Sequence, residues 1–214
     1  MTAEPAFAPI TLQLPGGKGR FVLEYPLTEE TDVPQNALFK QPEFTRYLPM
    51  IDPNPSLEAT RTRRLSQTVD PNTKVFSIRS CSTGDFEGSL GLYRMDHPNH
   101  AAEAGLVVFA NRHRSGVATE ALFLLLEHAF GTHENGGMGF NRITFVTNAA
   151  NAAMRGWLDS AAGAALEAVS REAWFDVKAE QYHDSVTYAI LKSEWEGKCK
   201  DILYTKLCNY LTSA

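Results

Sequence analysis

The stretch from Val107 to Ala121 holds the residues whose types and spacing best suit a chemical role. An apolar, β-branched run is followed by a polar Arg-His-Arg-Ser-Gly segment at 112–116, and then by strong helix formers. The first turn of a helix has amide N–H groups without partners inside the helix, and it carries partial positive charge. Glycine admits a ligand close to the backbone, and arginine adds charge-assisted hydrogen bonds. The pattern therefore predicts a strand, an anion-binding turn and a helix, with phosphate as the expected anion.

Composition and charge indicate one soluble globular domain. The chain has 214 residues, of which 43% are hydrophobic and 21% charged, and its formal net charge is -5. This charge, without a long basic run, argues against nucleic acid as a partner. No apolar run has the length of a membrane helix and residues 1–10 lack a signal-peptide core, so we expect a cytoplasmic protein with no membrane partner. Cys81, Cys199 and Cys208 are too few and too scattered for a disulfide framework or a metal-binding pair.

Hydrophobic periodicity divides the chain into three parts. Residues 1–19, rich in Pro and Gly, are expected to form a loosely ordered lead-in, and residues 20–195 a single domain. Residues 196–214 carry apolar side chains at helical spacing and predict a helical tail that packs either on the domain or on a second copy, which leaves a homodimer open. The expected strands are 20–25, 74–80, 86–94, 103–110, 140–147, 164–175 and 185–192, although the composition of 164–175 also permits a helix. The expected helices are 28–39, 56–69, 118–130 and 151–162.

Short segments in a fixed order carry a resemblance to a known family. They are Gly91-Leu92-Tyr93, Ala102-Glu103-Ala104-Gly105-Leu106, Arg114-Ser115-Gly116-Val117-Ala118-Thr119-Glu120-Ala121, Phe140-Asn141-Arg142, Asn148-Ala149-Ala150-Asn151, Asp184-Ser185-Val186-Thr187-Tyr188 and Glu194-Trp195. Over about residues 20–195 the chain resembles the GNAT superfamily of acyl-CoA-dependent N-acyltransferases, and most of all the branch of ribosomal-protein N-terminal alanine acetyltransferases. The resemblance implies an α/β fold of the α+β kind, with a mixed, mostly antiparallel sheet that is splayed at the cofactor and helices on both faces.

The resemblance also implies a donor site for acetyl-CoA. In the family, a turn of the form Gln/Arg-x-x-Gly-x-Gly/Ala binds the pyrophosphate of coenzyme A through backbone N–H groups, and it maps onto residues 113–118, with His113 as a departure at the first position. Asn151 matches the asparagine that contacts the pantetheine arm, although an N-cap role explains it equally well. The implied cofactor-binding residues are Val108, Arg112, His113, Arg114, Ser115, Gly116, Val117, Ala118, Thr119, Asn148 and Asn151.

Acyl transfer to an amine needs an unprotonated amine, a polarised thioester carbonyl and aligned reacting atoms. Glu103 is the implied base, because related enzymes have an acidic residue at this place; a surface-facing strand glutamate is the alternative. Leu158 stands where many family members have a tyrosine that protonates the leaving thiolate, so the thiolate leaves unassisted or is protonated by water. Tyr47, Tyr93 and Arg94 are expected to shape the acceptor pocket.

The favoured function is an N-acetyltransferase that moves an acetyl group from acetyl-CoA to a primary amine by direct attack in a ternary complex. The acceptor is a protein or peptide N-terminus or a small-molecule amine. The alternative is a catalytically weak acyl-CoA-binding regulatory or interaction protein, suggested by Leu158 and by Gly163-Ala164 in place of the family's Gly-Phe. No metal is predicted, because Asp96, His97 and His100 share one short turn and the remaining histidines are isolated.

Overall fold

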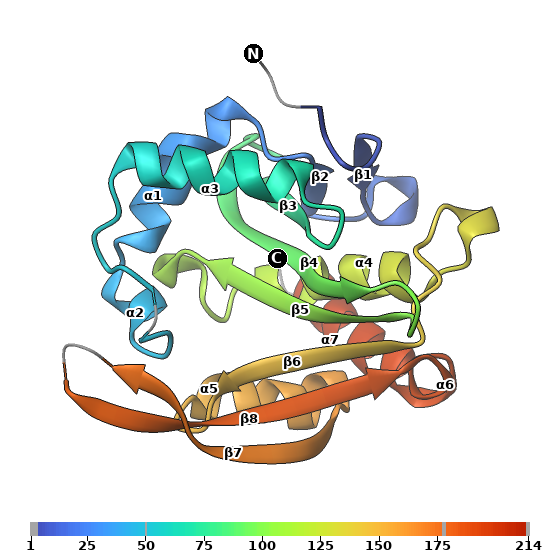
Figure 1. Ribbon diagram of the computed structural model, residues 1–214. Coiled ribbons are helices and arrows are strands. Elements are labelled where there is room, and N and C mark those ends of the chain that lie inside the picture. Colours follow the sequence, from blue (N-terminus) through green and yellow to red (C-terminus); the bar gives the residue numbers. More distant parts are fainter. Residues whose placement is uncertain (1–3, 50, 177–178, 213–214) are drawn as a thin grey trace.

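The computed structural model describes residues 4–49, 51–176 and 179–212, which form eight strands in one sheet of order β1-β2-β3-β4-β5-β6-β8-β7 (Figure 1). Neighbouring strands are antiparallel except β5 and β6, which are parallel. The strands are β1 Ile10–Leu12, β2 Phe21–Tyr25, β3 Lys74–Ser80, β4 Phe86–Asp96, β5 Ala101–Val108, β6 Arg142–Asn148, β7 Ala165–Asp176 and β8 Gln181–Leu191. The expected mixed, mostly antiparallel α/β fold is confirmed.

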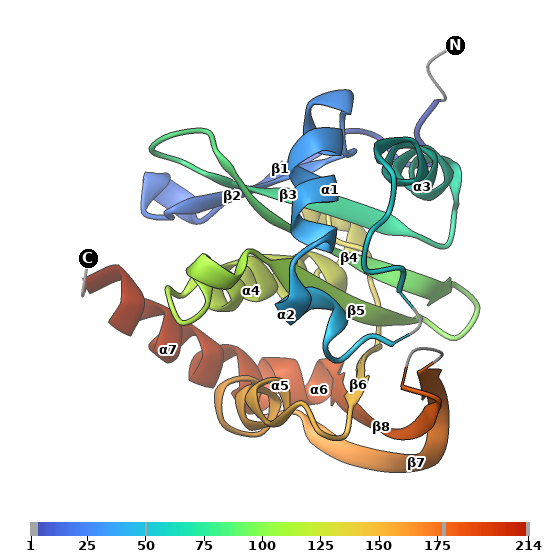
Figure 2. The same ribbon diagram turned by 90° about the vertical axis from the view of Figure 1, so that its left-hand side faces the viewer.

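Helices cover both faces of this sheet, as Figures 1 and 2 show together. On one face lie α1 (Asp32–Phe39), the short α2 (Pro42–Thr45) and α3 (Leu57–Val69), with α1 contacting β4 and α3 contacting β3. On the other face, α4 (Val117–Phe130) contacts β2, β4 and β5, and α7 (Lys200–Thr212) lies along α4. Two further helices are α5 (Ala152–Trp157), continued by a π-helical turn at Leu158–Ala162, and α6 (Lys192–Glu194). No described helix is long and apolar enough to cross a membrane.

Local sequence signals explain the two longest helices on the opposite faces. Ser56 caps α3, since its Oγ accepts a hydrogen bond from the N–H of Ala59 at 3.0 Å. The helix α4 is apolar around nearly its whole circumference, and it is correspondingly buried along nearly its whole length. It therefore forms the central support of one face of the sheet.

The strands β5 and β6 pair with each other over only three residues, from Ala101 to Glu103 of β5. Beyond that point β5 stays bonded to β4 as far as Val108, whereas β6 stays bonded to β8 as far as Asn148. The two halves of the sheet therefore separate after Glu103, as Figure 1 shows. The backbone of residues 104–108 has no neighbouring strand on this side, so its polar groups are available to a ligand.

The N-terminal segment is more ordered than its composition indicates. Ile10–Leu12 forms β1 and pairs with β2, and the ring of Phe7 lies 6.2 Å from that of Tyr25. Three residues are too few to produce a periodic pattern, which is why the sequence does not signal this strand. At the other end, Leu203 and Leu207 of α7 are fully buried against the same domain. Residues 1–3 of the predicted lead-in and 213–214 of the predicted tail lie outside the described residues.

Lys74 is buried beneath this N-terminal segment and makes no ion pair with a described carboxylate. Its Nζ lies 5.1, 5.4 and 5.7 Å from the ring centroids of Phe7, Tyr25 and Phe76, and 3.2 Å from His128 Nε2. Burial lowers the pKa of Lys74 to about 8, and burial together with the Lys74 charge lowers the pKa of His128 to about 4. The ring faces replace part of the hydration that the ammonium loses. Lys74 thus contacts both the N-terminal segment and the sheet, and the burial of its charge lowers the stability of the fold.

Lys74→Met is expected to remove a pH-dependent part of the stability. The pKa of Lys74 falls from 10.5 to about 8 on folding, so between these values the unfolded chain binds more protons and stability rises with pH. From pH 8 to pH 10, the free energy of unfolding in urea should rise by roughly 2 kcal/mol more in the native chain than in the variant. Lys18→Met, at an exposed lysine, is the control and should keep the native pH dependence. The same pH dependence in all three proteins would contradict the lowered pKa of Lys74.

Candidate functional site

The turn between β5 and α4 presents backbone N–H groups at the wide end of the separated strands. Gly116 is the N-cap of the 14-residue helix α4 and has φ +89°, and Arg114 has φ +62°, so both adopt the left-handed conformation. The N–H groups of Gly116, Ala118 and Thr119 donate to no carbonyl of the described residues. Amides of this kind at a helix N-terminus, with the helix dipole behind them, bind anions.

A buried glutamate and a partly buried arginine support this turn from beneath. Glu120 is completely buried in the first turn of α4, and its Oε1 accepts hydrogen bonds from the backbone N–H groups of Arg20 at 2.8 Å and Phe21 at 3.0 Å. Arg20 Nη2 in turn donates to the Ser115 carbonyl at 3.0 Å. Burial outweighs these bonds and raises the pKa of Glu120. No pattern in the sequence predicts this pair, because the two residues are 100 positions apart and share no motif.

A cavity of about 1290 Å³ contains this turn and follows the separated strands to the face covered by α1 and α3. Twelve of the predicted site residues line it: Tyr47, Tyr93, Arg94, Glu103, Val108, Arg112, His113, Arg114, Gly116, Ala118, Thr119 and Asn151. The structure thus brings residues from the α2–α3 loop, β4, β5, the β5–α4 turn, α4 and the N-cap of α5 into one space. The predicted donor residues and the predicted acceptor residues share that space.

Three predicted cofactor-binding residues, Ser115, Val117 and Asn148, do not line the cavity. The hydroxyl of Ser115 donates to the Arg112 carbonyl at 2.7 Å, and the side chain of Val117 packs in the core. Asn148 is buried, and its Oδ1 accepts a hydrogen bond from the N–H of Ala150 at 2.9 Å. Their side chains shape the turn, the core and the end of β6, and their role in cofactor binding stays a prediction.

The arginines of the turn differ in their availability. Arg112 lines the cavity, but its Nε and Nη2 donate to the two carboxylate oxygens of Glu87, which leaves the two N–H groups of Nη1 and the second N–H of Nη2 for an anion. This pairing raises the pKa of Arg112. Arg114 and His113 are exposed and form no ion pair with a described residue. Arg114 is therefore the arginine best placed to add charge-assisted bonds to a bound phosphate.

The opposite wall of the cavity is formed by β6 and α5. Asn151 is the N-cap of α5, since its Oδ1 accepts from the N–H of Met154 at 3.2 Å, and it also lines the cavity. Leu158 is fully buried, so that position supplies no proton donor. The indole N–H of Trp157 donates to Thr119 Oγ1 at 3.3 Å and joins α5 to α4. Both Asn151 and Trp157 are thus held by hydrogen bonds within the protein.

The carboxylate of Glu103 lies at the point where β5 leaves β6. Its Oε2 accepts from Arg94 Nη1 at 2.7 Å, and the Glu103 side chain is 24% exposed whereas that of Arg94 is 79% exposed. Tyr93 is the cross-strand partner of Glu103. Burial raises the pKa of Tyr93 to about 12, so its hydroxyl is neutral at physiological pH. Glu103 is therefore an accessible carboxylate with one solvent-facing partner.

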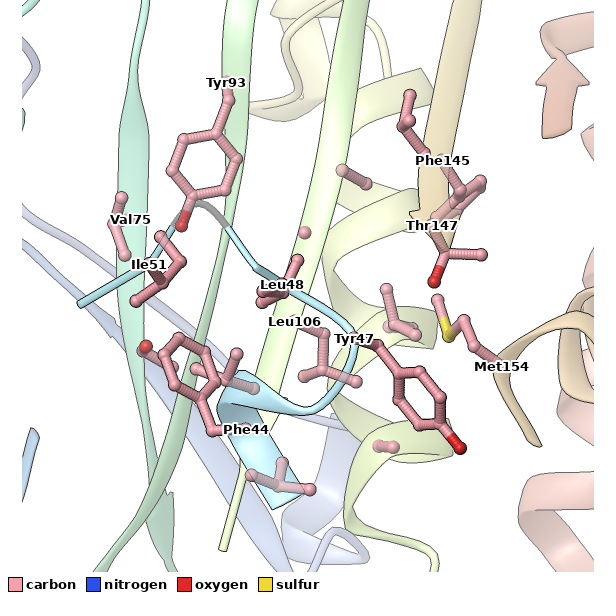
Figure 3. Close-up of a pocket in the computed structure, with 18 of the residues that line it drawn as sticks. Phe44, Tyr47, Leu48, Ile51, Val75, Tyr93, Leu106, Phe145, Thr147 and Met154 are labelled. Atoms are coloured by element: carbon pink, nitrogen blue, oxygen red, sulfur yellow. The ribbon is translucent and has the colours of Figure 1, made fainter. Parts of the chain in front are cut away.

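Figure 3 shows how the loop between α2 and α3 crosses this part of the cavity. Leu48 and Ile51 lie on the side of Tyr93 and Val75, while Tyr47 extends toward the side of Met154 on α5. The labelled side chains of this loop, Tyr47, Leu48 and Ile51, thus add apolar and aromatic surface to the cavity.

The turn between β4 and β5 lies outside the cavity. Asp96, His97 and His100 do not line it, and the Asp96 carboxylate accepts from Asn99 Nδ2 at 2.8 Å. Within the described ranges, no group of three or more His, Cys, Asp and Glu side chains is arranged to hold a metal ion.

Comparisons with known proteins agree on one family. The family model described as an acetyltransferase (GNAT) domain matches residues 20–162. An assigned acetyltransferase from T. thermophilus has 25% identity, a TM-score of 0.75 and coverage of 94% of this chain and 98% of its own. A GCN5-related N-acetyltransferase from Brucella melitensis has 19% identity and a TM-score of 0.75, and the match covers 97% of this chain and 89% of that protein. Spermidine N-acetyltransferase from Vibrio cholerae, in complex with CoA and spermine, has 15% identity, a TM-score of 0.72 and coverage of 83% and 99%. No curated protein sequence matches the chain.

Gly116→Ala is expected to destabilise the fold more than an alanine at another glycine with positive φ. A Cβ at Gly116 would lie 2.6 Å from Arg20 Nη2 and 2.6 Å from Tyr210 Cγ, whereas a Cβ at Gly84 (φ +76°) meets nothing within 4 Å. Gly84→Ala, the matched control, should lower the free energy of unfolding by roughly 1 kcal/mol through backbone strain alone. Gly116→Ala should lower it by roughly 2 to 4 kcal/mol, because steric overlap is added. Equal losses in urea unfolding would show that Tyr210 and Arg20 do not pack on Gly116.

Proposed function

Because this chain belongs to the GNAT acetyltransferase family, we propose that it moves an acetyl group from acetyl-CoA to a primary amine by direct attack in a ternary complex. One observation carries the proposal: a single cavity contains both the anion-binding turn at Gly116 and the carboxylate of Glu103. Donor and acceptor can then be bound side by side, which direct transfer requires.

The donor occupies the gap between β5 and β6 in this proposal. The pyrophosphate of CoA binds the free amides of Gly116, Ala118 and Thr119, with Arg114 beside them. The pantetheine arm lies along the unpaired side of β5, where the backbone of residues 104–108 can bond to it as to an added strand. The side chain of Asn151 contacts the same arm, and backbone N–H groups near Val108 polarise the thioester carbonyl.

Glu103 is the proposed proton acceptor. The amine nitrogen must lose a proton to attack the carbonyl carbon, and Glu103 takes that proton directly or through a water molecule. As the new C–N bond forms, the C–S bond breaks and CoA leaves as a thiolate. Leu158 supplies no proton and the Trp157 N–H is bonded to Thr119, so water protonates the thiolate.

The acceptor is proposed to be an amine that carries an apolar or aromatic group, such as a peptide N-terminus, rather than a polyamine. Asp32 and Glu103, two of the carboxylates that line the cavity, are paired with Arg64 at 2.6 Å and Arg94 at 2.7 Å. Glu43 and Asp70 also line the cavity and pair with no arginine among the described residues, so the preference rests on the apolar wall that the loop between α2 and α3 offers and not on a lack of negative charge.

Leu158 favours a second candidate, an acyl-CoA-binding protein with weak catalysis that acts by regulation or interaction. The two candidates share the donor site and differ only in turnover.

Glu103→Gln is expected to lower kcat by about 100-fold, because the proton acceptor is lost while the side chain keeps nearly the same size and shape. The Kd for acetyl-CoA in calorimetry should stay unchanged, since Glu103 lies away from the turn. Glu167→Gln is the matched control: Glu167 also pairs with an arginine, Arg142, but does not line the cavity, so its kcat should be native. Full activity of the Glu103 variant would remove Glu103 as the base.

Thiol release from acetyl-CoA, measured against peptides, aromatic amines and spermidine, tests turnover and acceptor class together. We expect release with amines that carry apolar or aromatic groups, and less with the polyamine. Preference for spermidine would contradict the proposed acceptor class, and release with no amine despite acetyl-CoA binding would favour the regulatory alternative. Failure to bind acetyl-CoA at millimolar concentration would contradict the donor site itself.

A further inference from the structure

The C-terminal helix α7 lies against the turn that carries Gly116. A Cβ on Gly116 would lie 2.6 Å from Cγ and 3.0 Å from Cβ of Tyr210, so this tyrosine packs directly on the glycine. Figure 2 shows the C-terminal end of α7 reaching the loop that precedes α4. Tyr210 and Lys206 both line the cavity that contains the turn. The family match ends at residue 162, so it assigns no role to α7.

Buried residues of α7 fix this helix in the core. Leu203 and Leu207 are fully buried, and the ring of Tyr204 lies 5.4 Å from that of Phe123 on α4. Just before these residues, Lys200 Nζ donates to Glu127 Oε2 on α4 at 2.8 Å. Because Lys206 and Tyr210 are four residues apart, they share one side of the helix, and this packing holds that side toward the cavity.

Lys206 brings a positive charge to the cavity without an acidic partner. No carboxylate oxygen of the described residues lies within 4.0 Å of its Nζ. Since Tyr210 touches Gly116, Lys206 lies about one helical turn, roughly 6 Å along α7, from the anion-binding turn. Arg114, which also lines the cavity, likewise has no ion-pair partner among the described residues. Positive groups beside free amides attract an anion that carries more than one charged group.

We propose that α7 forms a wall of the nucleotide end of the donor site, where Lys206 pairs with a phosphate of CoA and Tyr210 packs over the pyrophosphate-binding turn. The inference rests on the proposed function, since it requires CoA to occupy that turn. CoA offers two sources of phosphate charge, the pyrophosphate and the 3′-phosphate, and an ammonium group binds either by the same chemistry.

Calorimetric titration of Lys206→Gln with CoA tests this assignment. The Kd should rise about 5- to 10-fold at low salt through loss of one charge-assisted contact, and the effect should shrink at high salt. Lys198→Gln removes an exposed charge from the same C-terminal segment away from the cavity, so it should bind CoA as the native chain does. With 3′-dephospho-CoA, the difference between native chain and Lys206→Gln disappears if Lys206 binds the 3′-phosphate, and it persists if Lys206 binds the pyrophosphate.

A charge reversal separates a charge contact from a change in packing. Lys206→Glu should weaken CoA binding further than Lys206→Gln, with thermal unfolding unchanged in both. Equal losses in the two variants would indicate altered packing of α7 and overturn the assignment. Native affinity in Lys206→Gln would also overturn it while leaving the proposed function intact. A native chain that does not bind CoA at all would contradict the proposed function instead.

Discussion

The early separation of β5 from β6 is the constraint on which the rest of the site depends. If β5 and β6 were paired along their whole length, the backbone N–H and C=O groups of β5 that point toward β6 would be hydrogen-bonded to β6 and closed to a ligand. Here the ladder ends at Glu103, while β5 keeps its bonds to β4 and β6 keeps its bonds to β8. Each half of the sheet is therefore stable by its own pairing. The gap between them places the turn of α4 and the Glu103 carboxylate in one cavity.

The orientation of the turn depends on a buried polar network. Glu120 binds two backbone N–H groups at the start of β2, and Arg20 reaches back to the carbonyl of Ser115. Burying a carboxylate is unfavourable, and the two hydrogen bonds to Glu120 offset only part of this cost while they fix α4 relative to the sheet. The free amides therefore have their positions before any ligand binds. Such pre-organisation reduces the ordering cost of binding.

The two ends of the cavity differ in charge and polarity, and this difference suits two different reactants. The end at the turn has free amides with Arg114 and Lys206, none of which meets a described carboxylate within ion-pair distance. At the other end, Glu103 is paired with Arg94 and the loop between α2 and α3 adds apolar and aromatic walls. A polyanionic donor is favoured at the first end, and a compact amine at the second.

The sequence by itself determined the local elements: the β5–turn–α4 unit, the hairpin of β3 and β4, and α3 with its Ser56 cap. These depend on residues close together in the chain, whose periodicity and capping chemistry can be recognised directly. It could not supply β1, the bond between Arg20 and Glu120, the engagement of Arg112 by Glu87, or the contact of Tyr210 with Gly116. Only the tertiary structure decided these: β1 is too short to give a periodic pattern, and the other three contacts join residues that are distant in the chain. Such a contact depends on how whole elements pack, and no local pattern records that packing.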